Sequence, residues 1–199
     1  MHDVRYALTS APDVTLSQDD LSSQPFDSLY FRRDDGPRIS LVLSQADGGQ
    51  QRWLSADAAT LVVSAGRVTN TVAFNQELLF VTELERDPLQ AGVAQLAEAQ
   101  PWTRQLDWQA SGFQNTEVRS TFVEAAPSVL QHWGLQVPVR VFHEQVTVLS
   151  SGQQFQNSYW FAAETGTLLK SRQHLFPGGP VLEFEFISRF NRLVGEPSS

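Results

Sequence analysis

The sequence predicts an all-β, mainly antiparallel fold, in which a meander sheet curls into a barrel or half-barrel with one or two short helices. Glycine-centred turns separate many short β-like runs, and the helix-length spacers of a βαβ protein are absent. The run 137–149 is also too long for a flat strand. We expect one domain over residues 1–199, made of an N-terminal arm with a short helix (1–24), a β domain (25–190) and a tail (191–199).

The first predicted element is a helix of about two turns over residues 17–23. Ser17 followed three positions later by Asp20 is a capping-box pattern, in which each residue bonds the other's backbone amide.

The strands are predicted from pairs of β-like runs that flank a glycine turn, because glycine adopts the positive φ that tight hairpins require. Successive hairpins favour a meander of neighbouring strands. The predicted pairs are 39–43 with 51–55, 61–64 with 67–72, 137–149 with 153–163, 153–163 with 167–175, and 167–175 with 181–190.

A second short helix is predicted from Asp87-Pro88 onward. Proline suits the first helical position, and Leu89, Val93 and Leu96 would share one face. An internal Gly92 weakens this helix, because glycine is a poor helix former.

The run 137–149 has an apolar face that changes sides. Odd-numbered valines up to Val141 give way to even-numbered ones from Val146. We therefore expect a bulge, a bend or a switch of layers near His143. A strand of this length suits a barrel.

In the last predicted strand, 181–190, Phe184 and its apolar neighbours alternate with Glu183 and Glu185. This pattern is typical of a half-buried strand with one wet face. Residues 195–199 read as a frayed tail.

Charge and composition exclude several classes of function. The net charge is −8, so a nucleic-acid partner is not expected, since phosphate binding needs excess Lys and Arg. There are no cysteines, which excludes thiol catalysis, disulfides and Cys-ligated metals. No apolar run approaches the ~20 residues of a membrane helix, and the first ten residues lack the apolar core of a signal peptide.

No catalytic, metal or cofactor motif is present, so we expect a protein that is not an enzyme. Glu183 and Glu185 are the best carboxylate pair for glycan chemistry, but on one strand they point in parallel, which favours a solvated face. The histidines lack metal-ligand spacing, and no serine elbow or phosphate loop occurs. The four histidines are His2, His132, His143 and His174.

Aromatic residues are the positive signal, because aromatic faces stack on sugar rings and polar neighbours bind hydroxyls. The alternative is that they fill a β core. Trp160 faces opposite its two aromatic neighbours, which suggests that both sides of its strand are covered. The residues predicted to bind a glycan or a protein partner are Trp102, Arg104, Trp108, Trp133, His143 and Trp160.

A series of short segments occurs in a fixed order along the chain. The segments are PFDSLYFR (25–32), DGP (35–37), WLSAD (53–57), GRV (66–68), DW (107–108), YWF (159–161), ETG (164–166) and KSRQHL (170–175) followed by PG (177–178). This ordered series, from about Pro25 to Phe190, resembles the group 4 capsule polysaccharide lipoprotein family, of the YjbF and GfcB type.

The resemblance implies an exported lipoprotein on the periplasmic side of the outer membrane, encoded with exopolysaccharide or capsule export components. We expect that a leader and a lipidated cysteine precede residue 1 in the natural precursor; the alternative is a soluble relative. The family supplies no established catalytic residues.

Three functions follow from these observations. The first is a non-enzymatic accessory that assists capsule or exopolysaccharide production and export, with polysaccharide-export proteins or the polysaccharide as partner and a lipid anchor in the outer membrane. The second is a half-barrel carrier or sensor of an apolar ligand such as an acyl chain. It rests on the bent long strand and on an aromatic strand followed by an ETG turn, which recurs in periplasmic lipid carriers. The third is a glycan-active enzyme that uses Glu183 and Glu185.

Overall fold

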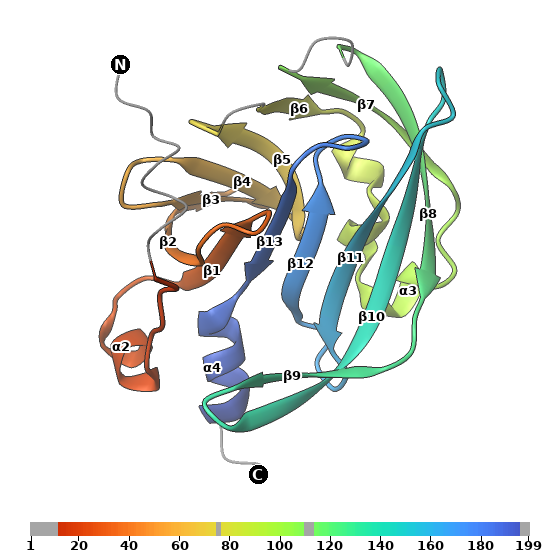
Figure 1. The fold of residues 1–199 in the computed structure, drawn as a ribbon. Coiled ribbons are helices and arrows are strands. Elements are labelled where there is room, and N and C mark those ends of the chain that lie inside the picture. The colour runs from red at the N-terminus through yellow and green to blue at the C-terminus, as the bar shows by residue number, and fades with distance from the viewer. Residues whose placement is uncertain (1–11, 75–76, 110–113, 196–199) are drawn as a thin grey trace.

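A computed structural model describes residues 12–74, 77–109 and 114–195. These residues form a nearly closed antiparallel barrel of twelve strands with three short α-helices (Figure 1). The predicted all-β class is therefore confirmed. The strands are β1 (Ser28–Arg33), β2 (Ile39–Asp47), β3 (Gln50–Leu54), β4 (Thr60–Ser64), β5 (Arg67–Val72), β6 (Leu78–Val81), β7 (Trp102–Trp108), β8 (Thr116–Glu124), β9 (Ser128–His132), β10 (Leu135–Val148), β11 (Gln154–Ala162), β12 (Leu168–His174) and β13 (Val181–Glu185).

The helical segments lie at the margins of the barrel. They are α2 (Gln18–Ser23), the 3₁₀ turns η1 (Leu84–Arg86) and η2 (Pro88–Ala91), α3 (Val93–Leu96) and α4 (Ile187–Gly195). Within the described ranges, no helix has both the length and the apolar character needed to cross a bilayer.

Most strands neighbour the next strand along the chain, as the predicted meander requires. The order around the barrel is β5-β4-β3-β2-β1-β13-β12-β11-β10-β8-β7-β6, and β9 pairs with β10 outside this path. The first and last of the described strands are thus neighbours in the middle of the sheet, where β1 pairs with β13.

Side chains bridge the seam between β5 and β6, the two ends of the sheet. The Leu78 amide donates to Thr71 Oγ1 at 2.9 Å, and Asn70 Nδ2 donates to the Leu79 carbonyl at 2.7 Å. These bonds take the place of a backbone ladder, so the barrel is nearly closed without a continuous ring of strands.

The interior of the barrel is filled by the protein's own side chains. Its largest cluster contains fully buried aromatic residues from several strands, among them Trp53, Trp108, Phe142, Tyr159 and Phe184. Burying aromatic side chains of this size supplies much of the apolar contact area that stabilises the fold.

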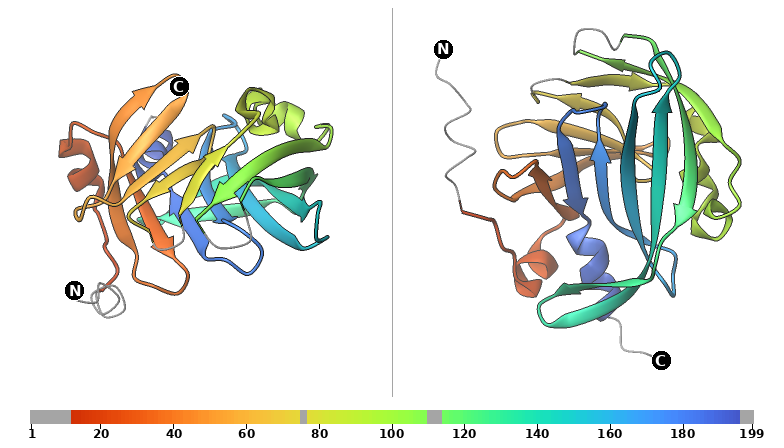
Figure 2. Two further views of the ribbon diagram at one scale, coloured as in Figure 1. Left: turned by 90° about the horizontal axis from the view of Figure 1, so that it is seen from above. Right: turned by 45° about the vertical axis from the view of Figure 1, so that its right-hand side comes forward.

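The long strand β10 switches layers and has no bulge at His143. It pairs with β11 without a register shift from Val139 to Thr147, while its other neighbour changes from β9 to β8. The outer side of its first half, with Val139 and Val141, is covered by a second apolar cluster that includes Phe190 of α4. Because this cluster covers the outer side of the first half of β10, the apolar residues there point outward, whereas in the second half they point inward. Strand β9 crosses below α4 (Figure 2, right).

The prediction of a strand over 181–190 followed by a tail over 191–199 is wrong at residues 187–195, where the structure has a helix. Strand β13 ends at Glu185, and α4 begins at Ile187. Both Phe186 and Ile187 are buried, so the two-residue alternation stops there. From Ile187 onward, Phe190 and Val194 recur at helical spacing and place an apolar face against the barrel. Residues 196–199 lie outside the described part.

The N-terminal helix forms as its capping pattern predicts. Ser17 Oγ accepts from the Asp20 amide at 3.1 Å, and Asp20 Oδ2 accepts from the Ser17 amide at 2.8 Å. The second predicted helix is only partly formed. Asp87 caps the 3₁₀ turn η2, and Gly92, at φ +84°, separates that turn from the four-residue α3.

Candidate functional site

The structure divides the six predicted binding residues between the inside and the outside of the barrel. On β7, alternate residues point inward, which places Trp102, Arg104 and Trp108 in the interior. Trp108 has no exposed surface and Trp102 only 5%. Both tryptophans pack in the main hydrophobic cluster of the barrel, so for them the core interpretation holds. Trp133, His143 and Trp160 lie on the outside.

A charged network occupies the centre of the interior, and the Glu144 carboxylate is its hub. Glu144 Oε2 accepts from Arg67 Nη1 at 2.9 Å, and its Oε1 lies 3.2 Å from Arg104 Nη2. Three neutral side chains also donate to this carboxylate: Ser120, at 2.5 Å, Asn157, at 2.9 Å, and Tyr159, at 3.0 Å.

Arg67 also connects the barrel wall to the crossover between β6 and β7. Its Nε and Nη2 donate to the two oxygens of Asp87 at 2.5 and 3.1 Å. The guanidinium groups of Arg67 and Arg104 lie 4.8 and 4.3 Å from the ring centroid of Trp102. Trp102 and Arg104 therefore contact the interior network and do not form a surface site.

The surroundings of Glu144 and Arg104 keep both groups charged near neutral pH. Burial disfavours the carboxylate of Glu144, but Arg67 and Arg104 outweigh burial and hold its pKa well below the usual range. Burial lowers the pKa of Arg104 to about 10, against the opposing effect of Glu144. Neither Glu144 nor Arg104 therefore changes its protonation state near pH 7.

Sequence reasoning missed this network, although one signal was present. Glu144 shares the inward face of β10 with Phe142 and Val146, so a charge stands on an otherwise apolar face. Such a charge needs buried partners. Nothing local to Glu144 identifies those partners.

A small cavity adjoins the network, bordered by Arg104, Asn157 and His174. The centre of a water-sized sphere can occupy about 20 Å³ within it, so the cavity has room for about one water molecule. Arg104 Nε and His174 Nδ1 have no hydrogen-bond partner among the described residues. The cavity is too small for an acyl chain.

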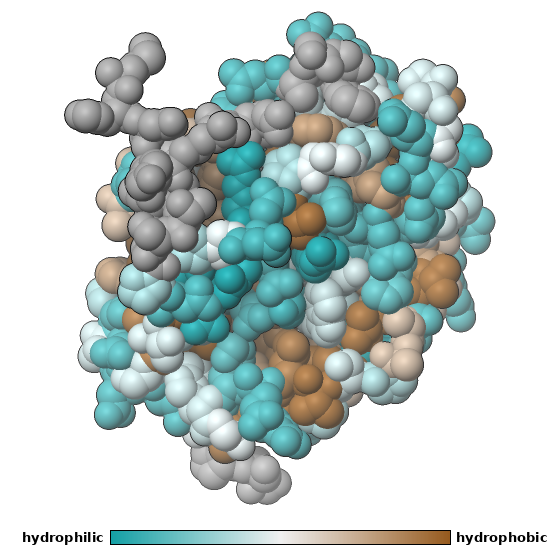
Figure 3. All heavy atoms as spheres, viewed as in Figure 1, coloured by the Kyte–Doolittle hydropathy of each residue, from teal (hydrophilic) through white to brown (hydrophobic). Residues whose placement is uncertain are grey.

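The second polar feature is the outer face, which we define as two rows of residues across five neighbouring strands. Hydrophilic residues cover much of this side, and an apolar patch lies near α4 and the lower ends of the strands (Figure 3). The rows, from β10 across β11, β12 and β13 to β1, are His143, Ser158, Arg172, Glu183 and Arg32, and Val141, Trp160, Lys170, Glu185 and Tyr30.

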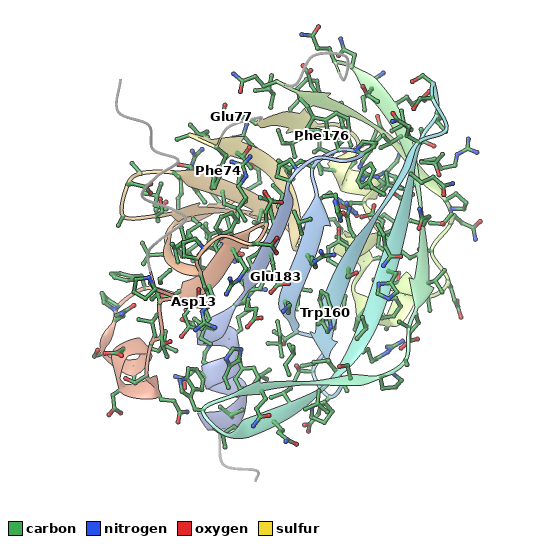
Figure 4. The ribbon with its side chains drawn as sticks, viewed as in Figure 1. Asp13, Phe74, Glu77, Trp160, Phe176 and Glu183 are labelled. Carbon is green, nitrogen blue, oxygen red and sulfur yellow. The ribbon has the colours of Figure 1, made fainter. Side chains whose placement is uncertain are left out.

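Lys170 organises the centre of the outer face. Its Nζ donates to Glu183 Oε1 at 2.9 Å and to Glu185 Oε1 at 2.8 Å, and it lies 5.5 Å from the Trp160 ring centroid. Figure 4 shows Trp160 and Glu183 on this side of the barrel. His132 Nε2, from β9, lies 2.8 Å from Glu185 Oε2. The face is thus held in place by ion pairs.

Glu183 and Glu185 both bind the Lys170 ammonium, so they do not lie on a simply solvated strand face. The side chains of Glu183 and Glu185 are 30% and 18% exposed. Burial raises the pKa of Glu185, but bonds to His132 and Lys170 outweigh it and lower the pKa to about 2. A glycosidase needs one carboxyl that keeps its proton near neutral pH, and Glu185 does not meet this requirement.

The other two outer residues make structural contacts. His143 Nδ1 lies 2.9 Å from Ser158 Oγ. Trp133 Nε1 donates to the Leu16 carbonyl at 2.9 Å and so fastens the N-terminal arm to the barrel. Trp133 and Trp160 both border the second apolar cluster. The structure thus brings Trp133, His143 and Trp160 to one side of the molecule.

Metal binding finds no support in the residues that the structure describes. They contain no group of three or more potential ligands close enough to hold an ion. His2 lies outside the described residues.

Together, the fold and these two polar features define a side-chain-filled antiparallel barrel with a buried charged network and an ion-paired outer face. The sequence profile of the family described as "Group 4 capsule polysaccharide lipoprotein gfcB, YjbF" matches residues 1–187. The chain belongs to this family, as its ordered segments indicated.

Two relatives and one solved structure support the assignment. The uncharacterized lipoprotein GfcB of Escherichia coli K12 is 34% identical over 184 residues, covering 92% of this chain and 86% of GfcB. The uncharacterized lipoprotein YjbF of the same organism is 32% identical over 170 residues, or 85% of this chain and 78% of YjbF. The crystal structure of the hypothetical lipoprotein YmcC, also from E. coli K12, has a TM-score of 0.76 at 32% identity and covers 92% of this chain and 90% of that one.

Proposed function

We propose that this protein is a non-enzymatic accessory of capsule or exopolysaccharide production and export, which acts by docking through its outer face. Its partner is the polysaccharide or a polysaccharide-export protein. By analogy with the lipoproteins to which it is similar, it works in the periplasm, held at the outer membrane by a lipid anchor.

The observation that carries the proposal is the fixed arrangement of charges on the outer face. Lys170 binds the carboxylates of Glu183 and Glu185 at 2.8–2.9 Å, and Trp160 lies beside Lys170. The exposed Arg172 lies in the row between Glu183 and His143. Aromatic and arginine side chains dominate the binding energy of many contact surfaces. A rigid polar surface of this kind favours recognition, since little side-chain entropy is lost on binding.

The two alternative functions are less well supported. An apolar carrier needs an open internal cavity, whereas the interior of this barrel is filled by its own core, with about 20 Å³ beside the network. A glycan-active enzyme would need a protonated carboxyl, and the low pKa of Glu185 opposes that role.

Complementation of a deletion strain tests the proposal. We expect the strain to export less polymer, the wild-type gene to restore export, and Arg172→Glu to fail, because it reverses charge at the centre of the outer face. Arg119→Glu, at another exposed arginine on β8, serves as the matched control and should restore export. Normal export by the deletion strain, or full rescue by Arg172→Glu, would contradict the proposal.

Loss of rescue has to be separated from loss of folding. Both variants are therefore compared with the wild type by circular dichroism and by urea unfolding. A double Glu183→Gln/Glu185→Gln variant that exports polymer of altered chain length, with its fold intact, would favour the glycan-active enzyme.

A further inference from the structure

A groove of about 530 Å³ lies at one mouth of the barrel, and none of its lining residues belongs to the outer face. It is bounded by the β2–β3 hairpin, the β4–β5 and β11–β12 turns, η2 and the side of α4. Its volume falls in the range of about 300–1,000 Å³ that is usual for small-molecule sites, and barrel mouths are common positions for such sites. We call it the mouth groove.

The base of the mouth groove is apolar and its rim is polar. Leu89, Phe161 and Leu168 provide largely buried apolar side chains. Gly49 and Gly92 lie on the rim at positive φ, and a Cβ at either position would meet no heavy atom within 4 Å. Both glycines are exposed, so a ligand can approach the backbone there.

Two glutamines of the rim present complementary hydrogen-bonding groups. Gln51 Oε1 accepts from Arg189 Nη2 at 2.9 Å, which leaves the Gln51 amide nitrogen as a donor. Gln90 Nε2 donates to Ser64 Oγ at 2.9 Å, which leaves the Gln90 amide oxygen as an acceptor. Hydroxyl groups both donate and accept, so they suit a rim that offers both functions.

The charges of the mouth groove argue against an anionic ligand. Asp47 and Arg189 are its charged lining residues and have opposite signs. The Arg189 guanidinium also donates to the Leu168 carbonyl at 3.1 Å and lies 3.6 Å from the Phe186 ring centroid. A polyanion would require several cationic side chains directed at it.

We propose that the mouth groove binds a short neutral segment of saccharide, with sugar C–H faces on the apolar base and hydroxyls on the glutamine rim. The choice of a saccharide over other neutral polyols rests on the proposed function. The site itself is separate from the outer face, so the two proposals can fail independently.

The test is an NMR titration of the ¹⁵N-labelled protein with four neutral trisaccharides: maltotriose, cellotriose, mannotriose and galactotriose. We expect at least one to shift the signals of Gly49, Gln51 and Gln90 in a saturable way at millimolar concentration. The acidic trigalacturonate should cause at least tenfold weaker binding. Absence of shifts at these residues with all four neutral sugars, or a preference for trigalacturonate, would overturn the proposal.

A blocking variant ties binding to the mouth groove. Gln50 is exposed on its rim, and Gln50→Trp should weaken binding at least tenfold by filling the space. Gln105→Trp, at an exposed position on β7 outside the lining, is the matched control and should bind as the wild type does. Equal affinity of both variants would also overturn the proposal.

The failures of the two proposals give different patterns. Sugar binding in the mouth groove together with full export by Arg172→Glu would contradict only the docking function. Loss of export in Arg172→Glu without any sugar binding would contradict only the saccharide site.

Discussion

Replacement of Glu144 by glutamine is expected to destabilise the protein strongly. The Glu144 carboxylate accepts hydrogen bonds from Arg67, Ser120, Asn157 and Tyr159 at 2.5–3.0 Å and pairs with Arg104 at 3.2 Å. Glutamine has nearly the same shape, but it removes the negative charge and turns an N–H₂ donor toward groups that are themselves donors. Breaking a buried ion pair on one side costs about 3–5 kcal/mol, and we expect a loss of that size in unfolding free energy.

The assay is urea unfolding followed by tryptophan fluorescence. The midpoint should fall while the m-value stays constant, because the surface exposed on unfolding does not change. Glu124→Gln is the matched control, since Glu124 forms a bidentate pair with Arg140 at 2.7 and 2.9 Å on the surface. Its loss should be far smaller, because water screens an exposed pair. A Glu144→Gln variant that loses less than about 1 kcal/mol, or no more than Glu124→Gln, would show that the network does not depend on the Glu144 charge.

Three further predictions follow from single contacts. In Glu185→Gln, the free energy of unfolding should depend less on pH below pH 4.5 than it does in the wild type. The folded-state pKa of Glu185 is lowered from 4.5 to about 2, so the stability that its charge contributes is complete above pH 4.5 and is lost as the pH falls toward 2. Unfolding free energies measured across that range, with no difference between variant and wild type, would contradict this assignment. Gly66→Ala should destabilise by about 1–3 kcal/mol in thermal unfolding, because Gly66 has φ +94° and an added Cβ would lie 2.0 Å from Leu168 Cδ2; an unchanged Tm would refute it. Ser17→Ala should weaken α2 by about 1 kcal/mol through loss of its N-cap, seen as faster amide exchange in residues 18–23 only, and unchanged exchange there would count against the capping role.

Sequence reasoning worked best where the signal lies within a few residues. The Ala65-Gly66 turn, the alternation around Glu183 and the capping pair of Ser17 and Asp20 each report a local geometric requirement, and each predicted its element correctly. It failed at 186–190, where alternating phenylalanines continue the strand pattern into a helix. There the packing of Phe190 on the second cluster decided the structure.

The binding residues show the same division. Trp102, Arg104 and Trp108 stand out in the sequence as an aromatic and charged segment, but sequence alone cannot say which face of β7 points inward. Burial on that face made Arg104 part of the network and the two tryptophans part of the core. The other three predicted residues, Trp133, His143 and Trp160, lie on the outside of the barrel and are partly exposed.

The amino-acid sequence by itself determined the all-β class, several of the hairpins and the family, because turn chemistry and strand alternation depend on neighbouring residues. The tertiary structure decided the closure of the barrel, the network around Glu144, the ion pairs of Lys170 and the mouth groove. Arg67 and Glu144 are 77 residues apart in the chain, and Gln51 and Arg189 are 138 apart. Contacts over such distances depend on how the strands are arranged around the barrel, and no local pattern encodes that arrangement.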